Sequence, residues 1–189
     1  MSAQDSKLFV ISGPSGAGKG TLVARVRERR SNLGLTVSAT TRAPRKGEVD
    51  GVNYFFLTRE EFDRRVANGE FVEWAEVHGN CYGTLVSEVQ SKLASGASLI
   101  LEIDVQGALQ VKERFPEAVL IFIKPPSLEV LRERLVGRGT ESPETIELRM
   151  ANAAHELALA DRYDDVVVND DLDRATDELV RVLDMHERI

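Results

Sequence analysis

Near its amino terminus the chain reads Gly13-Pro14-Ser15-Gly16-Ala17-Gly18-Lys19-Gly20-Thr21. An apolar run, Leu8–Ser12, precedes this stretch, and an amphipathic segment, Thr21–Arg30, follows it. Strand, glycine-rich loop, lysine and helix in this order are the sequence pattern of a P-loop. Main-chain N–H groups and the helix N-terminus attract phosphate oxygens there, and Lys19 adds a full positive charge. The stretch therefore predicts a polyphosphate site at residues 13–21, rather than a plain glycine-rich turn with a solvated lysine.

One position departs from the usual form of this loop. The residue after the lysine is normally Ser or Thr, whose hydroxyl contacts Mg²⁺. Here that residue is Gly20, and the hydroxyl comes one position later, on Thr21. The pattern therefore leaves open whether Thr21 contacts the metal directly.

Apolar runs and helical periodicity alternate along the rest of the chain. The strand candidates are Leu8–Ser12, Ser98–Ile103, Val119–Ile123 and Asp165–Val168. The helix candidates between and after them include Thr21–Arg30, Leu85–Leu93 and Asp173–His186. Short apolar runs without polar alternation are typical of parallel strands buried on both faces. The alternation predicts an α/β fold with a doubly wound parallel sheet.

Composition bounds the class of protein. The chain has 189 residues, of which 42% are hydrophobic and 29% charged, so one globular unit is expected. Its net charge of −7 gives no global positive field for nucleic acid. The single cysteine, Cys81, excludes an intramolecular disulfide, and no stretch resembles a signal peptide or a membrane span. We therefore expect a cytoplasmic protein with neither nucleic acid nor membrane as a partner; a homo-oligomer is left open.

Two regions interrupt the alternation and are interpreted as inserted lobes. Residues 38–88 contain short extended pieces and a helix, Thr58–Asn68, that begins with a capping box. Residues 127–157 are rich in arginine and helical, with Ser142-Pro143 as a helix start. Arginines without apolar backing favour a mobile cover. The core is then expected at residues 5–37, 89–126 and 158–189.

Motifs beyond the P-loop decide between classes of nucleotide-binding protein. The guanine-reading Asn-Lys-x-Asp motif of GTPases does not occur in the sequence. The chain instead contains VSATTRAPRKGE at 37–48, GVNYFF at 51–56, FVEWA at 71–75, YGT at 82–84, IDVQG at 103–107, GRGTE at 137–141 and VNDD at 168–171. In this order and spacing, from about Leu8 to the terminal helix, the sequence resembles the guanylate kinases.

The resemblance implies a fold, an activity and a cofactor. The fold is a P-loop kinase core that carries a nucleoside-monophosphate-binding lobe, at 38–88, and a helical lid, at 127–157. The implied activity transfers the γ-phosphoryl group of ATP to GMP, with dGMP as a second acceptor, and gives ADP and GDP. The implied cofactor is Mg²⁺, held mainly through nucleotide phosphates and waters, with Thr21 and Asp104 as candidate side-chain contacts.

Guanine recognition needs a carboxylate beside hydroxyls, because the base presents N1–H and N2–H₂ as donors and O6 as an acceptor. Glu73 offers the carboxylate, and Ser38 and Thr84 offer hydroxyls, at positions where the family reads the base. Adenine would leave these groups mispaired. Asp104 follows a strand and has two open roles, accepting from the guanine amino group or holding a magnesium-bound water. Glu102 is expected to face the other side of the sheet.

The resemblance also assigns phosphate-binding and catalytic residues. The GMP-binding set is Ser38, Arg42, Arg45, Tyr54, Glu73, Tyr82, Gly83, Thr84 and Asp104. The ATP-binding set is Gly13, Pro14, Ser15, Gly16, Ala17, Gly18, Lys19, Gly20 and Thr21, with Asn169 near the adenine ring. The catalytic set, which stabilises charge on the transferred group, is Lys19, Arg42, Arg134, Arg138 and Arg149. For the lid arginines the alternative is ion pairing with nearby glutamates on an exposed helix.

Two other functional classes are considered. A guanylate-kinase-like domain can serve as a peptide-binding module, but the retained P-loop lysine and arginines argue against this. Another P-loop kinase with a different acceptor is the second, and Glu73 with Ser38 and Thr84 argues against it. Trp74 is expected in the core of the lobe, because single aromatic residues usually pack.

Overall fold

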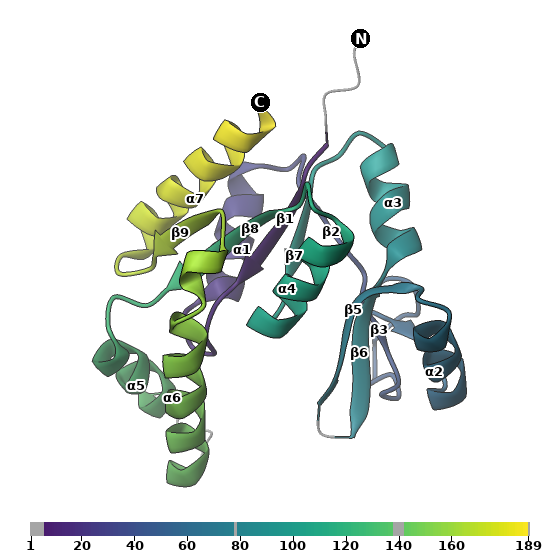
Figure 1. Cartoon of the computed structure of the whole chain (residues 1–189), viewed down its shortest axis with the longest axis horizontal. Helices are drawn as coiled ribbons and strands as arrows, with labels where there is room; N and C mark the ends of the chain where they lie inside the picture. Colours follow the sequence, from purple (N-terminus) through teal and green to yellow (C-terminus); the bar gives the residue numbers. More distant parts are fainter. Residues whose placement is uncertain (1–5, 78, 138–141, 189) are drawn as a thin grey trace.

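The computed structural model describes residues 6–77, 79–137 and 142–188 (Figure 1). The strands are β1 (Leu8–Ser12), β2 (Gly34–Leu35), β3 (Ala39–Thr40), β4 (Phe55–Phe56), β5 (Phe71–Val77), β6 (Asn80–Leu85), β7 (Leu99–Glu102), β8 (Val119–Lys124) and β9 (Asp165–Val168). The helices are α1 (Lys19–Arg29), α2 (Arg59–Ala67), α3 (Val86–Ala94), α4 (Val105–Arg114), α5 (Leu128–Gly137), α6 (Pro143–Leu157) and α7 (Leu172–Glu187), and a short 3-10 helix spans Ala160–Arg162.

The central sheet has five parallel strands in the order β2-β7-β1-β8-β9. Strand β1 lies in the middle and is buried along its whole length, because helices cover both faces of the sheet. Apolar side chains of α1 and α7 pack on one face, and those of α3 and α4 pack on the other. The predicted doubly wound parallel sheet is confirmed. All four predicted strands form, with end positions that differ by at most one residue.

A second, smaller sheet lies within the first inserted region, with strands in the order β4-β3-β6-β5. Its core includes Phe62 of α2, stacked on Phe71 of β5 with ring centroids 4.3 Å apart. Thr58 caps α2 as predicted, since its hydroxyl accepts from the Glu61 N–H at 3.1 Å. The prediction for Trp74 is wrong: its ring touches Phe62 edge-on, but 41% of the residue is exposed. Trp74 and the buried Glu73 are consecutive in β5 and so point to opposite faces of the strand, with Trp74 on the face where it meets Phe62.

Helices α5 and α6 form the second inserted region. Ser142 caps α6 and Pro143 is its first residue, as the sequence predicts. The expectation that this region lacks apolar backing is wrong. Its two helices share a small core of buried apolar side chains, made by Leu131, Leu135, Ile146 and Ala153. Leu131 and Leu135 lie four positions apart on α5, and Ile146 and Ala153 lie seven apart on α6; both separations place side chains on one helical face.

Figure 1 shows how the two inserted regions sit relative to the central sheet. In this view, helices α5 and α6 lie below one side of the sheet, and the β5–β6 hairpin with α2 lies below the other. The carboxyl ends of the parallel strands and the amino end of α4 lie between them. The exact division into core, lobe and lid at residues 38, 88, 127 and 157 stays a prediction. Within the described ranges, no helix has both the length and the apolar character that crossing a membrane requires.

Candidate active site

The loop between β1 and α1 is shaped by glycines in conformations that other residues avoid. Gly13, Gly16 and Gly18 have φ values of 141°, 89° and 89°. A Cβ on Gly13 would lie 2.2 Å from the main-chain oxygen of Ile123 in β8. The loop closes through a hydrogen bond from the Ala17 N–H to the Pro14 oxygen at 3.1 Å. Close approach to β8 and left-handed backbone together require glycine at position 13.

Lys19 is the first residue of α1 and folds back over the loop. Its Nζ donates to the main-chain oxygens of Gly13, at 2.6 Å, and Pro14, at 3.2 Å. The ammonium group is therefore held at the mouth of the loop rather than in open solvent. This is the position from which it can meet a phosphate enclosed by the loop.

Glu102 lies beside the P-loop, on the face of the sheet that α1 covers, whereas Asp104 caps α4 on the opposite face; the expectation that Glu102 faces the other side of the sheet is confirmed. Strand β7 pairs with β1, with Glu102 opposite Ile11, and a Cβ on Gly20 would lie 3.5 Å from Glu102 Oε1. Partial burial raises the pKa of Glu102, and the charge of Lys19 opposes that rise. The alternation of side chains along β7 explains this placement. Ile100 packs on the face covered by α1, and Glu102, two residues later, points to the same face.

A cavity of about 510 Å³ adjoins the outer side of the P-loop. Its lining includes Gly18, Thr21, Arg134 and Asn169. Asn169 is buried and donates from Nδ2 to the Ala17 oxygen at 2.8 Å, while its own main-chain oxygen accepts from Arg134 Nη2 at 2.8 Å. The structure thus brings Asn169 and Arg134 to the same wall, against the loop. The Arg134 Nη1 atom is buried and has no hydrogen-bond partner among the described residues.

The other two lid arginines have different outcomes. Arg149 of α6 reaches the P-loop, where its Nη1 donates to the hydroxyl of Ser15. Arg138 lies outside the described residues. Among the described residues, Arg132 and Glu147 form an ion pair on the surface of these helices, at 2.5 Å. Arg134 instead donates to the main-chain oxygen of Asn169, whereas ion pairing with a glutamate stays open for Arg149.

Glu73 and Thr84 face each other across strands β5 and β6. The Thr84 hydroxyl donates to Glu73 Oε1 at 2.8 Å, and both residues are buried. Burial is the main cause that raises the pKa of Glu73 to about 7; the nearby charge of Asp104 acts in the same direction, and the hydrogen bond with Thr84 acts in the opposite one. Gly83 lets the strands approach, since a Cβ there would lie 2.7 Å from the Glu73 main-chain oxygen.

Asp104 links this pair to the central sheet. It is the N-cap of α4, and its Oδ1 accepts from the Gly107 N–H at 2.8 Å. A Cβ on Gly107 would lie 3.3 Å from Glu73 Oε2 and 3.5 Å from Asp104 Oδ1. The first turn of α4 therefore meets the Glu73 carboxylate directly. Neither role left open for Asp104 is decided by this contact.

Arg42, Tyr54 and Tyr82 gather at one place in the smaller sheet. The Arg42 guanidinium lies over the Tyr54 ring, 5.4 Å from its centroid, and the two tyrosine rings meet edge-on at 6.2 Å. Arg45 is exposed on the loop that follows, and Ser38 is half-buried just before β3. The contact that the sequence reasoning missed is Glu48, which forms a two-point ion pair with Arg42. The sequence did point to this residue, because Glu48 is the last residue of the 37–48 motif.

The structure thus has two candidate nucleotide-binding surfaces. One is the P-loop on the core. The other, on the smaller sheet, combines the Glu73–Thr84 pair with Arg42 and two tyrosines. A family model described as guanylate kinase matches residues 5–186. The chain belongs to the guanylate kinase family.

Relatives within this family span nearly the whole chain. The guanylate kinase of Gloeobacter violaceus is 57% identical over 94% of this chain and 87% of its own length. The guanylate kinase of Halalkalibacterium halodurans is 51% identical over 97% of this chain and 90% of its own length. Among solved structures, guanylate kinase from Anaplasma phagocytophilum matches with a TM-score of 0.72 and 38% identity, covering 96% of this chain and 86% of that one.

Proposed function

We propose that this chain transfers the γ-phosphoryl group of ATP to GMP, giving ADP and GDP, and that dGMP is a second acceptor. The observation that carries the proposal is the buried Glu73–Thr84 pair on a lobe attached to a P-loop core. A buried carboxylate accepts from the N1–H and N2–H₂ of guanine, whereas adenine leaves it facing an unprotonated ring nitrogen. The names of the relatives support the same acceptor.

The ATP half of the proposed site consists of residues 13–21 and the adjoining cavity. The main-chain N–H groups of the loop would hold the phosphates. The base would enter the cavity beside Asn169 and Arg134, which line it. A guanidinium plane also stacks on aromatic rings. Arg134 is therefore proposed for adenine binding as well as for the charge stabilisation that the resemblance implies.

The GMP half is proposed to hold phosphate through Arg42, Arg45, Tyr54 and Tyr82. Three of these residues already lie together in the smaller sheet. A guanidinium presents parallel N–H groups that match a phosphate edge, and a phenolic hydroxyl adds a single donor. Guanine would lie beside Glu73, Thr84 and Ser38, with Asp104 at the base edge nearest α4.

Phosphoryl transfer in this site requires no general base, because the attacking phosphate of GMP is already anionic. The protein's contribution is to align the two nucleotides and to stabilise charge on the transferred group. Lys19, at the mouth of the loop, and Arg149, bonded to Ser15, are proposed for that role. Arg42 is proposed to add charge from the GMP side, and Arg138 from the lid.

The residues around the loop fit a magnesium ion that is carried by ATP. Within the described ranges no group of three or more His, Cys, Asp or Glu side chains is arranged to hold a metal. Glu102 instead brings single carboxylate oxygens to the first turn of α1, close to Gly20 and one residue from Thr21. Oxygen donors acting partly through water suit Mg²⁺. The ion would neutralise phosphate charge, with Glu102, Thr21 and Asp104 holding its waters.

A coupled ADP-release assay with ATP and Mg²⁺ tests the proposed function. GMP, dGMP, AMP, UMP and no acceptor are compared at one concentration. We expect turnover with GMP, slower or equal turnover with dGMP, and none above background with AMP or UMP. Turnover with AMP equal to that with GMP would reject the role of Glu73 as base reader. Absence of all acceptor-dependent turnover, with calorimetric GMP binding intact, would favour a peptide-binding module.

We also propose the partners and the location of the chain. ATP and GMP are the proposed partners, with neither nucleic acid nor a membrane, and the cytoplasm is the proposed location. The net charge of −7 supports the first exclusion. A homo-oligomer stays open.

A further inference from the structure

Glu48 occupies the centre of the loop that joins β3 to β4. Its Oε2 accepts from Arg42 Nη1 at 3.0 Å and from the main-chain N–H of Arg45 at 2.7 Å, while its Oε1 accepts from Arg42 Nη2 at 2.9 Å. The carboxylate and the guanidinium are only 19% and 16% exposed. Glu48 therefore joins the two arginines that are proposed to bind the GMP phosphate.

Arg42 makes further contacts besides its ion pair with Glu48. Its Nη1 also donates to the Ala43 oxygen at 2.7 Å, and its plane lies over the rings of Tyr54 and Phe56, at 5.4 and 5.9 Å. The fork of Arg42 holds the pKa of Glu48 below its usual range, so the carboxylate is charged throughout the neutral range. Without Glu48 the guanidinium would keep the ring contacts but lose the bonds that fix its orientation.

The contacts leave part of the guanidinium for a second anion. A guanidinium has five N–H groups. Three of those on Arg42 are donated to Ala43 and Glu48. The remaining two lie on the side that carries Nε, and Tyr82 lies close by, because its ring meets the Tyr54 ring over which the guanidinium lies. A phosphate can therefore bind Arg42 beside Tyr82 while Glu48 stays in place.

We propose that Glu48 is a positioning residue for the phosphate of GMP: it holds the Arg42 guanidinium and the main chain of Arg45 in the arrangement that the phosphate binds. The inference rests on the proposed function. The opposite role is that of a competitor, in which the carboxylate must leave Arg42 before phosphate can bind. The two roles predict opposite effects of removing the charge on Glu48.

The test compares Glu48→Gln with wild type in steady-state kinetics and in calorimetric binding of GMP and of guanosine. Glutamine keeps the shape and one acceptor oxygen but loses the charge, and hydrogen bonds to charged groups are the stronger ones. We expect KM and Kd for GMP to rise about tenfold, which corresponds to about 1.4 kcal/mol. The KM for ATP and the affinity for guanosine, which has no phosphate, should change less than about twofold.

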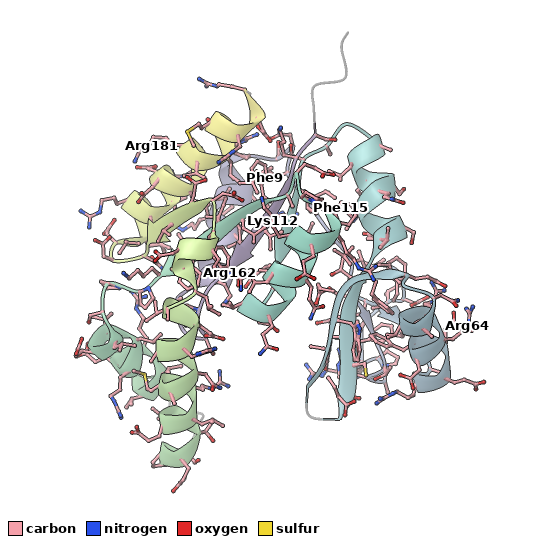
Figure 2. All side chains as sticks on the ribbon, in the orientation of Figure 1. Phe9, Arg64, Lys112, Phe115, Arg162 and Arg181 are labelled. Atoms are coloured by element: carbon pink, nitrogen blue, oxygen red, sulfur yellow. The ribbon has the colours of Figure 1, made fainter. Side chains whose placement is uncertain are left out.

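Glu61→Gln provides a matched control in the same lobe. Glu61 also pairs with two arginines, Arg64 and Arg65, but on helix α2. Figure 2 shows Arg64 pointing outward from α2, on the side of the lobe away from the central sheet. Glu61→Gln therefore removes an ion pair of the same kind without touching the phosphate residues. We expect its KM for GMP to match wild type.

A second variant shows whether Glu48 acts through Arg42. In an Arg42→Lys background, Glu48→Gln should add less than about twofold to the KM for GMP, because the guanidinium that Glu48 holds is gone. A full tenfold addition in that background would mean that Glu48 acts elsewhere.

Several results would overturn the inference. An unchanged or lower KM for GMP in Glu48→Gln would reject positioning, and a lower one would support the competitor. Equal losses of GMP and guanosine affinity would mean that the substitution disturbs the whole lobe. If Glu48→Gln melts far below wild type, Glu48→Asp is used in its place. Aspartate keeps the charge but has a shorter side chain, so the affinity for GMP should fall while the affinity for guanosine is unchanged. Failure of the proposed function is distinct, because wild type itself would then not phosphorylate GMP.

Discussion

The two nucleotide surfaces of this chain are built from different materials. The P-loop surface consists of main chain: three left-handed glycines, one turn hydrogen bond and a lysine anchored on carbonyl oxygens. The surface of the smaller sheet consists of side chains, arranged as pairs in which one partner holds the other. Arg42 is held by Glu48, and Glu73 by Thr84.

This difference has consequences for how each surface fails. Main-chain geometry is fixed by the central sheet, so a wrong residue in the loop strains the backbone of β1 or β8. A side-chain pair instead loses one hydrogen bond at a time, and each loss is worth about 1–3 kcal/mol. We therefore expect abrupt effects on the P-loop side and graded effects on the lobe side.

The largest effect is expected from Lys19→Ala, which removes the only side-chain charge of the P-loop itself. Loss of one charge-stabilising donor typically lowers kcat by about 10²–10³-fold. The Kd for GMP should change little, because the residues proposed to bind guanine lie on the other surface. Stopped-flow or coupled kinetics with calorimetric GMP binding separates the two quantities. A kcat near that of wild type would remove Lys19 from the transition state.

Next in size is Gly13→Ala, which tests main-chain strain. The φ of 141° and the 2.2 Å approach to Ile123 should together lower the free energy of unfolding by about 2–4 kcal/mol and weaken ATP binding. Gly96→Ala is the control, because Gly96 also has a positive φ, 84°, but no atom lies within 4 Å of its Cβ. We expect it to lose only about 1 kcal/mol. Equal melting curves for the two variants would mean that contact with β8 is unimportant.

The same contrast explains what could be predicted from the sequence. The P-loop and four of the five strands of the central sheet depend on local pattern, so the bounds of β1 and α1 around the loop were predicted within two positions, whereas the two-residue β2 was not predicted. The alternation of side chains along a strand also determines where Glu102 lies and how far Trp74 is exposed. It can be used only when the paired strand and the face that helices cover are known. The prediction for Glu102 was confirmed, whereas that for Trp74 was wrong, because tertiary context decides which face is buried.

The contacts of the lobe and of the lid could be predicted from local sequence patterns even less. Glu73 and Thr84 lie 11 positions apart in sequence, and they meet only because β5 and β6 pair with the register that sets residue 73 opposite residue 84. The Arg149–Ser15 contact joins residues 134 positions apart. Neither pairing follows from periodicity. The predicted roles of these residues in binding and catalysis remain predictions.

A pH profile tests the buried pair on the lobe side. The pKa of Glu73 is raised to about 7 in the folded protein, so below that pH the carboxyl is mostly protonated and cannot accept both guanine donors. We therefore expect kcat/KM for GMP to rise with pH, by up to about tenfold per unit below pH 7, and to level off above it. Glu73→Gln should give a low profile without this step. A wild-type profile that is flat from pH 6 to 8 would contradict the assignment.

The smallest effect is expected from Thr84→Ser, which separates the hydroxyl from the rest of the side chain. Serine keeps the donor to Glu73 Oε1 and loses one buried methyl group, so the KM for GMP should change by less than about threefold. Thr84→Val keeps the volume but removes the donor, which leaves the carboxylate without the bond that opposes its raised pKa. The midpoint of the pH profile should then move upward in Thr84→Val and stay in place in Thr84→Ser. If both variants shift the midpoint alike, packing rather than the hydrogen bond sets the charge of Glu73. The lobe would then depend on tight packing, as the P-loop side does, rather than on pairs of side chains.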